Sequence, residues 1–488
     1  MLVNQLIFQG AASKVALREK GTVYSYGQFQ ARTGSFRDYL YARGIREKDN
    51  VALFAKNSAD FIFSYMAVVS LGAVVVPLNT MLTPREIAFI LKDSGVKHII
   101  TDKQLDLAGQ YQEGPPPEQL PTSRIRQEVD QPTYPAAPEI PVQETAPCVI
   151  LYTSGTTGRP KGALLTHRNL VSNARSFSEA TGACADDNFL CVLPMFHSFG
   201  WTCSVLTALY NGASLTILES FQPKEVIATI RNQGVTVVMG VPAMYGFYAS
   251  LATPADLAGV RLFASGGASL PLEILNSFYK KTGKRVIEGY GLSEASPVVC
   301  FNPRHATKPG SVGLAVIDVE VKVEKNDGSE AGCREVGELL ARGPNIMLGY
   351  YGLPFESAEA LKGGWLYTGD LAYLDEEGYI FIVDRKKDII IVSGLNVYPR
   401  EVEEILYQHP AVKEAAVIGK PDKKRGETVR AFVVVKEGRK LNKKDLIVFL
   451  KANLASYKLP REIIEIETLP KNATGKILKK ELRETQTH

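Results

Sequence analysis

The chain has 488 residues, 45% of them hydrophobic, and a formal net charge of +4 from 56 basic and 52 acidic side chains. This length exceeds what one hydrophobic core supports, so we expect at least two folding units. The near balance of charge argues against nucleic acid as the main partner. The N-terminal segment has neither a basic leader nor a long apolar stretch, which argues against a secretory signal.

An integral membrane protein and a zinc-binding protein are also disfavoured. The longest apolar-rich run, residues 65–78, is interrupted by Ser70 and Gly72 and is too short to cross a bilayer. The six cysteines form no C-x-x-C pair, which argues against a zinc site and favours buried free thiols in a reducing compartment. We expect a cytoplasmic protein without an integral membrane segment. Peripheral membrane contact, and the choice between a monomer and a homodimer, stay open.

Residues 14–101 alternate between strand-like and helix-like segments. Strands are predicted at 15–18, 23–25, 51–54, 73–77 and 97–101, with helices at 59–70 and 84–91. Two capping boxes support the helix starts, Ser25 with Gln28 and Thr83 with Glu86. Strand, helix and strand in repetition predict a parallel α/β sheet.

Residues 103–147 are rich in proline and show little periodicity, so we expect a surface connection without core elements. From about 148 to 300 the alternation resumes. Strands are predicted at 148–151, 190–193, 215–218, 235–240 and 260–265, with a helix at 167–178. A second α/β sheet is therefore expected.

After about residue 300 the predicted secondary structure changes in character twice along the chain. Strand-like segments at 319–323, 337–341 and 379–383, separated by Gly and Asp turns, predict a small barrel or sandwich subdomain. The last hundred residues predict a separate α+β unit, with helices at 399–407 and 443–454 and strands at 414–418 and 430–435. We place the boundary near Asp384 and Arg385, dividing an N-terminal domain (1–384) from a C-terminal domain (385–488).

One stretch, YTSGTTGRPKG at 152–162, has the composition of a phosphate-binding loop. Glycines let backbone N–H groups approach an anion, hydroxyl side chains add donors, and Lys161 adds a positive charge. The spacing is not that of a P-loop NTPase, because Pro160 stands where a second glycine is required five residues after Gly155. The alternative is an ordinary Ser/Thr/Gly surface turn. If it is a phosphate loop, it is expected at a strand end of the second sheet.

A second stretch, EGYGLSEASP at 288–297, follows a predicted strand. Gly289 and Gly291 begin a G-x-G-x-x-G pattern, but Glu294 occupies the third glycine position, which disfavours a dinucleotide site. An acidic residue here suits a Mg²⁺ ligand, because Mg²⁺ commonly takes one or two carboxylates plus phosphate oxygens. The alternative is a helix start capped by Ser293 with Glu294 in its first turn.

Three further positions stand out near the C-terminus. Asp370 in YTGD could accept hydrogen bonds from ribose hydroxyls, and Arg385 in the DRKKD stretch could donate to the same region. Lys476 follows a glycine turn and precedes a predicted helix. Each of the three alone is a residue type commonly found on a protein surface.

Six stretches occurring together resemble the successive core motifs of the adenylate-forming superfamily. They are YTSGTTGRPKG, LPMFHSFG (193–200), EGYGLSE, YTGD, the DRKKD to SGLNVYPREVE block (384–403) and PKNATGKILK (470–479). This superfamily includes acyl-CoA synthetases, peptide-synthetase adenylation domains and luciferases, and the resemblance covers nearly the whole chain. It implies that a carboxylate attacks the α-phosphorus of ATP, pyrophosphate leaves, and a thiol then attacks the acyl-adenylate. The implied co-substrates and cofactor are ATP, coenzyme A and Mg²⁺.

The resemblance also assigns nucleotide-binding residues. The β- and γ-phosphates fall to Thr153, Ser154, Gly155, Thr156, Thr157, Gly158 and Lys161. The adenine is framed by Gly266, Gly267, Ala268, Glu288, Gly289 and Tyr290, followed by Gly291, and the ribose by Asp370 and Arg385. Thr157 or Ser293 supports the α-phosphate and the metal, with Glu294 as the metal ligand. Residue 293 is serine where the family usually has threonine, which keeps the hydroxyl.

The implied catalytic residues are Lys476, Glu294 and His197. In the family the C-terminal domain rotates between the two half-reactions, here about Lys387. That motion withdraws Lys476 from the α-phosphate and brings Ser393 and Gly394 to the thiol tunnel. The implied fold is α/β, with two α/β sheets and a barrel-like subdomain in a large N-terminal domain and a small mobile α+β C-terminal domain.

The acyl pocket is implied to include His197, Trp201, Val205, Met244, Tyr245 and Val298. Trp201 lies four residues after His197, the offset of a tryptophan that gates the acyl tunnel in some fatty acyl-CoA synthetases. The alternative is an aromatic side chain packed under a subdomain interface. None of these side chains would carry a fixed charge, so an apolar acid is expected, foremost a medium- or long-chain fatty acid.

Four other functions are compatible with parts of the sequence. An aryl acid of the benzoate or cinnamate type is the nearest alternative substrate, and loading of a carrier protein's phosphopantetheine is an alternative second step. A nucleotide-binding regulatory protein without turnover is disfavoured, because it has no use for Lys476. A serine hydrolase is disfavoured because the sequence contains no G-x-S-x-G motif.

Overall fold

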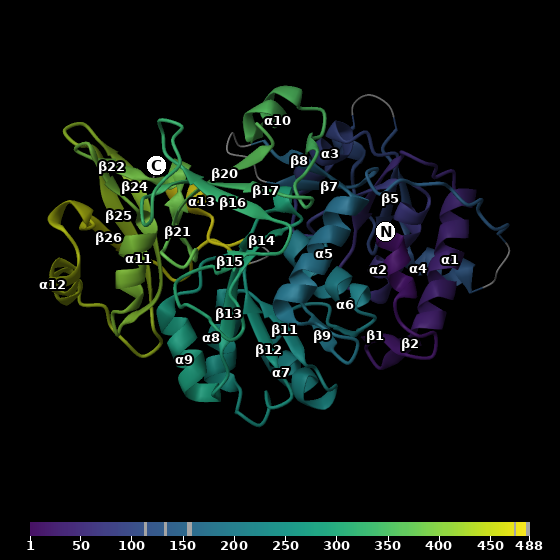
Figure 1. Cartoon of the computed structure of the whole chain (residues 1–488), viewed down its shortest axis with the longest axis horizontal. Helices are drawn as coiled ribbons and strands as arrows, with labels where there is room; N and C mark the ends of the chain where they lie inside the picture. The colour runs from purple at the N-terminus through teal and green to yellow at the C-terminus, as the bar shows by residue number, and fades with distance from the viewer. Residues whose placement is uncertain (112–114, 131–133, 154–158, 473–474, 485–488) are drawn as a thin grey trace.

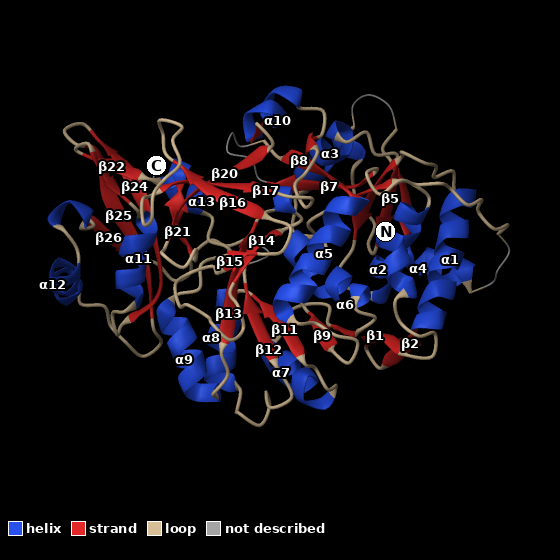
Figure 2. Cartoon of the chain, viewed as in Figure 1, coloured by secondary structure: helices blue, strands red, loops and turns tan. Residues whose placement is uncertain are grey.

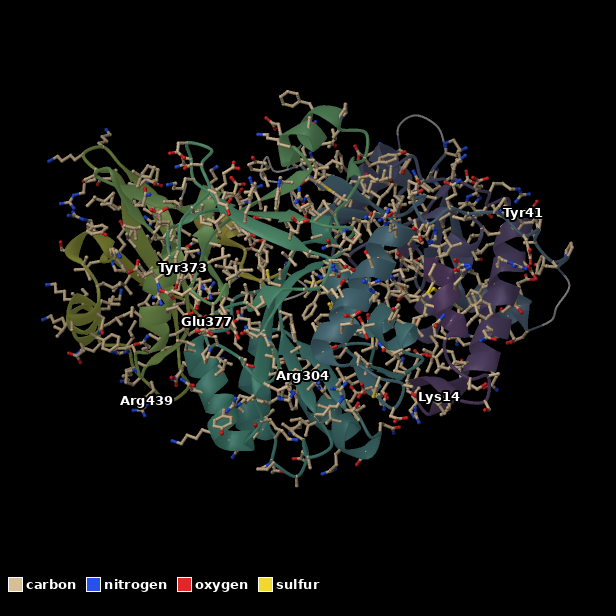
Figure 3. All side chains as sticks on the ribbon, in the orientation of Figure 1. Lys14, Tyr41, Arg304, Tyr373, Glu377 and Arg439 are labelled. Carbon is tan, nitrogen blue, oxygen red and sulfur yellow. The ribbon has the colours of Figure 1, made fainter. Side chains whose placement is uncertain are left out.

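A computed structural model of the chain describes residues 1–111, 115–130, 134–153, 159–472 and 475–484. Four sheets organise it. Three sheets lie in a large N-terminal part and the fourth in a smaller C-terminal part, which carries β22, β24, β25 and β26 at the left of Figure 1. Helices cover the N-terminal sheets (Figure 2). The labelled side chains of Arg439 and Lys14 lie toward opposite ends of the long axis (Figure 3).

The largest sheet has nine strands in the order β15-β14-β13-β12-β11-β9-β10-β1-β2. Their bounds are β1 (Val15–Glu19), β2 (Thr22–Ser25), β9 (Asn188–Cys191), β10 (Ser214–Ile217), β11 (Val237–Gly240), β12 (Leu262–Ser265), β13 (Val286–Gly291), β14 (Val298–Phe301) and β15 (Leu314–Ala315). The central strands from β1 to β13 pair in parallel, as expected for an α/β sheet. The outer strands β2, β14 and β15 pair antiparallel.

The second sheet has seven strands in the order β18-β8-β7-β4-β3-β5-β6. Their bounds are β3 (Asn50–Phe54), β4 (Val74–Pro77), β5 (His98–Thr101), β6 (Glu118–Pro121), β7 (Pro147–Thr153), β8 (Lys161–Thr166) and β18 (Gly349–Tyr350). The predicted sheet membership was wrong here. β7 pairs in parallel with β4, so the segment that carries the phosphate loop belongs to the sheet of residues 50–101, not to the sheet of residues 188–301. Conversely, β1 and β2 join the nine-stranded sheet.

The prediction that residues 103–147 contain no core element was also wrong. β6 pairs in parallel with β5, and α4 (Thr122–Val129) follows it. Leu120 and Ile125 are buried. β6 is the last strand of its sheet, and a proline such as Pro121 costs no ladder hydrogen bond on an outer edge, so the prolines did not exclude a strand.

Helix starts follow the sequence signals. Both capping boxes are present, at α1 (Tyr26–Ala42) and α3 (Pro84–Asp93). The other helices of the N-terminal part are α2 (Ala59–Ser70), α5 (His167–Thr181), α6 (Thr207–Tyr210), α7 (Pro223–Asn232), α8 (Pro242–Leu251), α9 (Leu272–Thr282) and α10 (Pro354–Ala360). No helix within the described ranges has both the length and the apolar character needed to cross a membrane.

Residues 320–385 form an antiparallel sheet, which confirms the predicted β-rich subdomain. Its strands are β16 (Glu320–Glu324), β17 (Gly337–Arg342), β19 (Leu361–Lys362), β20 (Trp365–Leu374) and β21 (Ile380–Arg385). The two-residue strand β18 leaves this stretch and pairs with β8 of the seven-stranded sheet. The subdomain is thereby attached to the strand that begins with Lys161.

The C-terminal part has its own sheet and its own buried clusters. It contains β22 (Ile390–Val392), β23 (Leu395–Val397), β24 (Val412–Asp422), β25 (Gly426–Val435), β26 (Glu462–Glu465), α11 (Pro399–Tyr407), α12 (Lys443–Asn453) and α13 (Lys479–Glu484). Its buried hydrophobic clusters draw on residues from Ile390 to Leu482, whereas those of the N-terminal part end at Ile380. The precise boundary at residue 384 remains a prediction.

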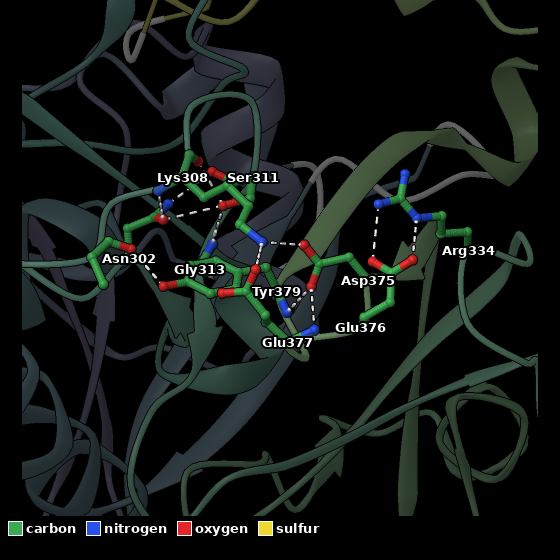
Figure 4. Close-up of polar contacts among 10 residues, drawn as sticks. Asn302, Lys308, Ser311, Gly313, Arg334, Asp375, Glu376, Glu377 and Tyr379 are labelled. Carbon is green, nitrogen blue, oxygen red and sulfur yellow. Dashed lines mark hydrogen bonds and ion pairs between the residues drawn. The ribbon is translucent and has the colours of Figure 1, made fainter.

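A polar network joins the nine-stranded sheet to the turn between β20 and β21 (Figure 4). The Asn302 amide donates to the carbonyl oxygen of Glu288, 3.1 Å away. Lys308, in the following loop, forms ion pairs with Asp375 and with Glu377. Tyr379 N donates to Asp375 Oδ1 at 2.9 Å. The strand that carries Glu288 is therefore fixed relative to the hairpin that carries Asp370 and Arg385.

The cysteines are all free, as expected, but they are not all buried. Cys148, Cys191, Cys203 and Cys300 are buried, whereas Cys184 and Cys333 are exposed. Both exposed thiols lie in connecting segments outside helices and strands, which run over the surface.

Candidate active site

Asp370 and Arg385 are cross-strand partners on β20 and β21. Arg385 Nε lies 3.2 Å from Asp370 Oδ1, and Tyr290 Oη donates to Asp370 Oδ2 at 2.6 Å. Asp370 is only 5% exposed. The structure thus brings together three residues, from two sheets, that the resemblance places around the nucleoside.

Glu288 lies buried just before Tyr290 on β13. Leu270 N donates to its Oε1 at 3.0 Å. Burial raises the pKa of the Glu288 carboxyl to about 7, and the positive charge of Arg400 opposes that shift. Glu288 can therefore hold a proton near neutral pH.

The glycines of this segment have a steric role. A Cβ added at Gly289 would lie 2.7 Å from the Phe301 ring, and one at Gly291 would lie 2.1 Å from the Pro297 carbonyl oxygen. Only glycine lets β13 and the chain after it approach this closely. The other three predicted adenine residues, Gly266, Gly267 and Ala268, follow β12 directly, beside β13 in the sheet.

Glu294 and Lys161 are brought together through Tyr350, which sequence reasoning missed. Tyr350 Oη donates to Glu294 Oε1 at 2.9 Å, and Lys161 Nζ lies 5.3 Å from the centre of the Tyr350 ring. Glu294 lies in a short 3-10 turn, Ser293–Ala295, which begins after Leu292 and has no side-chain cap, so the alternative of a helix capped by Ser293 is not realised. Ser293 Oγ lies 3.4 Å from Ser198 Oγ.

The phosphate loop is described only at its two ends. Thr153 closes β7 opposite Lys161, the first residue of β8, and its Oγ1 donates to the Lys161 carbonyl oxygen at 3.4 Å. Ser154, Gly155, Thr156, Thr157 and Gly158 lie outside the described residues. Their phosphate roles, and the metal role of Thr157, remain predictions.

His197 faces the site as a neutral imidazole. Burial, together with the smaller effect of the positive charge of Lys476, lowers its pKa to about 4. Its Nδ1 accepts a hydrogen bond from Phe199 N at 3.2 Å, so the proton of the neutral ring is on Nε2. The Phe199 ring in turn packs against Gly266. His197 can therefore donate to a substrate oxygen but carries no charge.

Lys476 arrives from the C-terminal part on a tight turn. Its N donates to Asn472 Oδ1 at 2.9 Å. A Cβ placed on the preceding Gly475 would lie 3.5 Å from Val241 of the N-terminal part. Burial lowers the pKa of Lys476 to about 8, with Arg385 adding to the shift and Asp370 opposing it. Lys476 is therefore near the Asp370–Arg385 pair and His197.

The candidate acyl-pocket residues are buried in this structure. Trp201 is 4% exposed and lies in a π-helix, Phe199–Leu206. Its ring centre is 4.1 Å from that of Tyr65 and 5.7 Å from that of Phe61, both on α2. Val205, Met244 and Val298 are also buried. Tyr245 is buried, and its hydroxyl donates to the Ala264 carbonyl oxygen at 2.6 Å.

The residues assigned to the thiol tunnel are not at this site. Ser393 and Gly394 form the exposed turn between β22 and β23. The predicted hinge residue Lys387 lies in a 3-10 turn after β21, next to Lys386, whose Nζ lies 2.8 Å from Glu338 Oε2. The arrangement observed therefore places Lys476, and not the hairpin turn, beside the N-terminal residues.

The donor set fits a magnesium ion held chiefly by phosphates. No group of three or more His, Cys, Asp or Glu side chains that could hold a metal occurs in the part of the chain that the structure describes. Glu294 offers one carboxylate, and Tyr350 occupies only one of its two oxygens. A site of this kind suits Mg²⁺, which is commonly bound by one or two carboxylates plus substrate phosphates.

Family models match both parts of the chain. The model described as "AMP-binding enzyme" matches residues 8–351, and the one described as "AMP-binding enzyme C-terminal domain" matches residues 401–476. The chain belongs to the AMP-binding enzyme family. It is an AMP-forming acid–CoA ligase, with ATP, Mg²⁺ and coenzyme A as co-substrates and cofactor.

Two curated relatives have the same percent identity to this chain but are named for different acids. A feruloyl-CoA synthase from Amycolatopsis is 36% identical over 475 residues, covering 96% of this chain and 95% of the relative. A long-chain-fatty-acid–CoA ligase from Bacillus subtilis is 36% identical over 497 residues, covering 92% and 88%. Overall similarity to members of the AMP-binding enzyme family therefore does not determine whether the substrate is an aryl or an alkyl acid.

Among solved structures, ATP-bound MatB from Rhodopseudomonas palustris aligns with a TM-score of 0.93 at 32% identity, covering 99% of both chains. Apo MatB from the same organism aligns over the same share of both chains with a TM-score of 0.82. The overall arrangement of this AMP-binding enzyme is thus closer to that of the ATP-bound relative.

Proposed function

We propose that the chain is an ATP- and Mg²⁺-dependent acyl-CoA synthetase for an apolar carboxylic acid, with medium- or long-chain fatty acids as the substrate class. The observation that carries the adenylation step is the position of Lys476 near Asp370, Arg385 and His197. A lysine that a second part of the chain brings to the nucleoside-binding residues has no role in a protein that only binds nucleotide.

In the proposed first step, a carboxylate oxygen forms a bond to the α-phosphorus of ATP while the bond to pyrophosphate breaks. Two anions approach each other, so positive charge at the reacting atoms stabilises the transition state. Lys476 supplies that charge, and His197 donates a hydrogen bond without adding charge. Glu294 would hold Mg²⁺, which would supply positive charge to offset the charge of the departing pyrophosphate.

In the proposed second step, the thiol of coenzyme A attacks the acyl carbon and AMP leaves. We propose that residues 385–488 rotate about Lys387 between the steps, withdrawing Lys476 and presenting the turn of Ser393 and Gly394. That turn is exposed while Lys476 is at the site. This supports a C-terminal part that presents one face, with Lys476, in the first step and another face, with the turn, in the second.

An aryl acid is a second candidate, favoured by one observation. Trp201 packs closely against Tyr65, with the ring planes tilted by 36°, and is buried, so a tunnel along this tryptophan is closed in the observed arrangement. A short, flat acid would not need the tunnel to open. A long alkyl chain would require Trp201 to move.

A pyrophosphate-release screen tests the proposal directly. Purified enzyme with ATP and Mg²⁺ is offered saturated acids of increasing chain length and a matched set of benzoates and cinnamates, each with and without CoA. The proposal predicts release with apolar acids and formation of AMP and acyl-CoA when CoA is added. Release without any CoA-dependent thioester would instead favour loading of a carrier protein.

Trp201→Ala tests which acid class the pocket serves. If Trp201 gates an acyl tunnel, its removal shifts the chain-length profile of kcat/KM, whereas Trp201→Phe, which keeps an aromatic ring, shifts it less. An unchanged profile from C4 to C16 acids in Trp201→Ala would rule out the gate. Activity confined to aryl acids in both variants would favour the second candidate.

A further inference from the structure

Tyr350 contacts both charged side chains on the phosphate side of the site. Its hydroxyl donates to Glu294 Oε1 at 2.9 Å, and Lys161 Nζ lies 5.3 Å from its ring centre. A cation above an aromatic ring is held by the ring's negative face. One side chain therefore connects the expected metal ligand to the lysine of the phosphate loop.

The backbone around Tyr350 is fixed to the same two elements. β18 pairs antiparallel with β8, with Tyr350 opposite Ala163. Tyr351 N donates to the carbonyl oxygen of Gly162 at 2.7 Å, directly after Lys161. On the other side, Met347 N donates to the carbonyl oxygen of Glu294 at 2.9 Å. The position of Tyr350 is thus determined by the strand that carries Lys161 and the 3-10 turn that carries Glu294.

The hydroxyl of Tyr350 is not needed to fill space, because phenylalanine has nearly the same shape. It satisfies one oxygen of the Glu294 carboxylate and leaves the other oxygen for a cation. Carboxylates that ligate metals are commonly oriented by such a hydrogen bond, and losing the partner typically costs about 10- to 100-fold in metal affinity. The ring, by contrast, acts on Lys161.

We propose that Tyr350 is a positioning residue for the metal and pyrophosphate side of the reaction: its hydroxyl orients Glu294 toward Mg²⁺, and its ring fixes the position of the Lys161 ammonium group. This inference rests on the proposed function, because it assumes that Glu294 meets Mg²⁺ and that Lys161 meets ATP. Neither substrate acid nor thiol takes part in it.

The test measures binding rather than turnover. Calorimetry follows the full-length enzyme binding α,β-methylene ATP, which cannot release pyrophosphate, over a range of Mg²⁺ concentrations, and separately binding AMP. In Tyr350→Phe the Mg²⁺ concentration needed for half-maximal analogue binding should rise roughly tenfold or more. AMP binding should be unchanged, because AMP has no β- or γ-phosphate.

Three comparisons make the result specific. Tyr351→Phe is the matched control, because its hydroxyl accepts from Asn50, 3.1 Å away, and not from the site, so its Mg²⁺ requirement should equal that of the wild type. In the Glu294→Gln background, adding Tyr350→Phe should not raise the Mg²⁺ concentration needed for half-maximal binding any further. Tyr350→Leu, which also removes the ring, should weaken analogue binding even at saturating Mg²⁺.

An unchanged Mg²⁺ requirement in Tyr350→Phe would overturn the inference while leaving the proposed function intact. An equal loss of AMP binding would also overturn it, because the tyrosine would then support the fold of the whole site. If wild-type enzyme bound the analogue with no dependence on Mg²⁺, the proposed function itself would fail, and the inference with it.

Discussion

The two sides of the candidate site come from different parts of the chain and are held in place by different kinds of structure. The nucleoside side is built from strands: Asp370 and Arg385 are cross-strand partners, and Tyr290 reaches Asp370 from another sheet. The other side, which supplies Lys476, is one turn of the C-terminal part. In this turn Lys476 N donates to Asn472, and Gly475 lies near Val241 of the N-terminal part.

This difference has a physical meaning. A nucleotide that stays bound through two chemical steps needs a site that is fixed before it arrives, and strand pairing supplies that rigidity. A lysine needed in only one step can sit on a turn of the C-terminal part, because it can then leave the site when that part moves. The structure thus separates the part of the site that stays from the part that we propose withdraws.

Breaking the fixed side should harm both half-reactions. Asp370→Asn keeps the shape but removes the charge that Arg385 faces, and hydrogen bonds to charged groups are worth about 1.5–3 kcal/mol. We expect a roughly 10- to 100-fold rise in KM for ATP, and a similar loss when acyl-adenylate is supplied with CoA. Asp327→Asn, in an exposed turn, is the control. Loss confined to the first half-reaction would contradict a role in holding the nucleoside.

The lysine side should show its own pH dependence. The pKa of Lys476 is lowered to about 8, so the charged form predominates below that pH and is lost above it. We expect kcat/KM for ATP in pyrophosphate release to fall about tenfold per pH unit above about pH 8, because this ratio reports the free enzyme. In Lys476→Arg the guanidinium stays charged, and the profile should be flat there. An identical alkaline limb in Lys476→Arg would assign the titration to another group.

The smallest effect is expected for a buried tyrosine of the hydrophobic core, and it is an effect on the free energy of unfolding. Tyr245→Phe removes the hydroxyl that donates to Ala264, so the free energy of unfolding should fall by about 1 kcal/mol. The Tyr248 hydroxyl is buried without a hydrogen-bond partner among the described residues, so Tyr248→Phe should cost nothing. Chemical denaturation measures both. A changed acid preference in Tyr245→Phe would place that hydroxyl in the acyl pocket instead.

Local signals in the sequence predicted the elements well. Apolar spacing and terminal signals located α2 at Ala59–Ser70 and α11 at Pro399–Tyr407 with their observed ends. Sheet membership was predicted less well, because pairing joins segments far apart in the chain. β7 pairs with β4, and β1 pairs with β10, and nothing within those segments indicates their partners.

The same distinction applies to the site. Motif order identified Asp370, Arg385 and Lys476, which the structure places near one another. Tyr350 was missed because its role depends on the pairing of a two-residue strand with β8. Its only signal is a Gly-Tyr-Tyr sequence after a turn, which by itself predicts nothing about Glu294.

The central claim is that a fixed nucleoside site meets a lysine that serves one step only. The most direct test compares the two half-reactions in Lys476→Ala: pyrophosphate release from ATP and acid, and thioester formation from supplied acyl-adenylate and CoA. Removing one preorganised donor is worth about 3 kcal/mol, so pyrophosphate release should fall by at least about a hundredfold while thioester formation is largely kept. An equal loss in both half-reactions would contradict the claim.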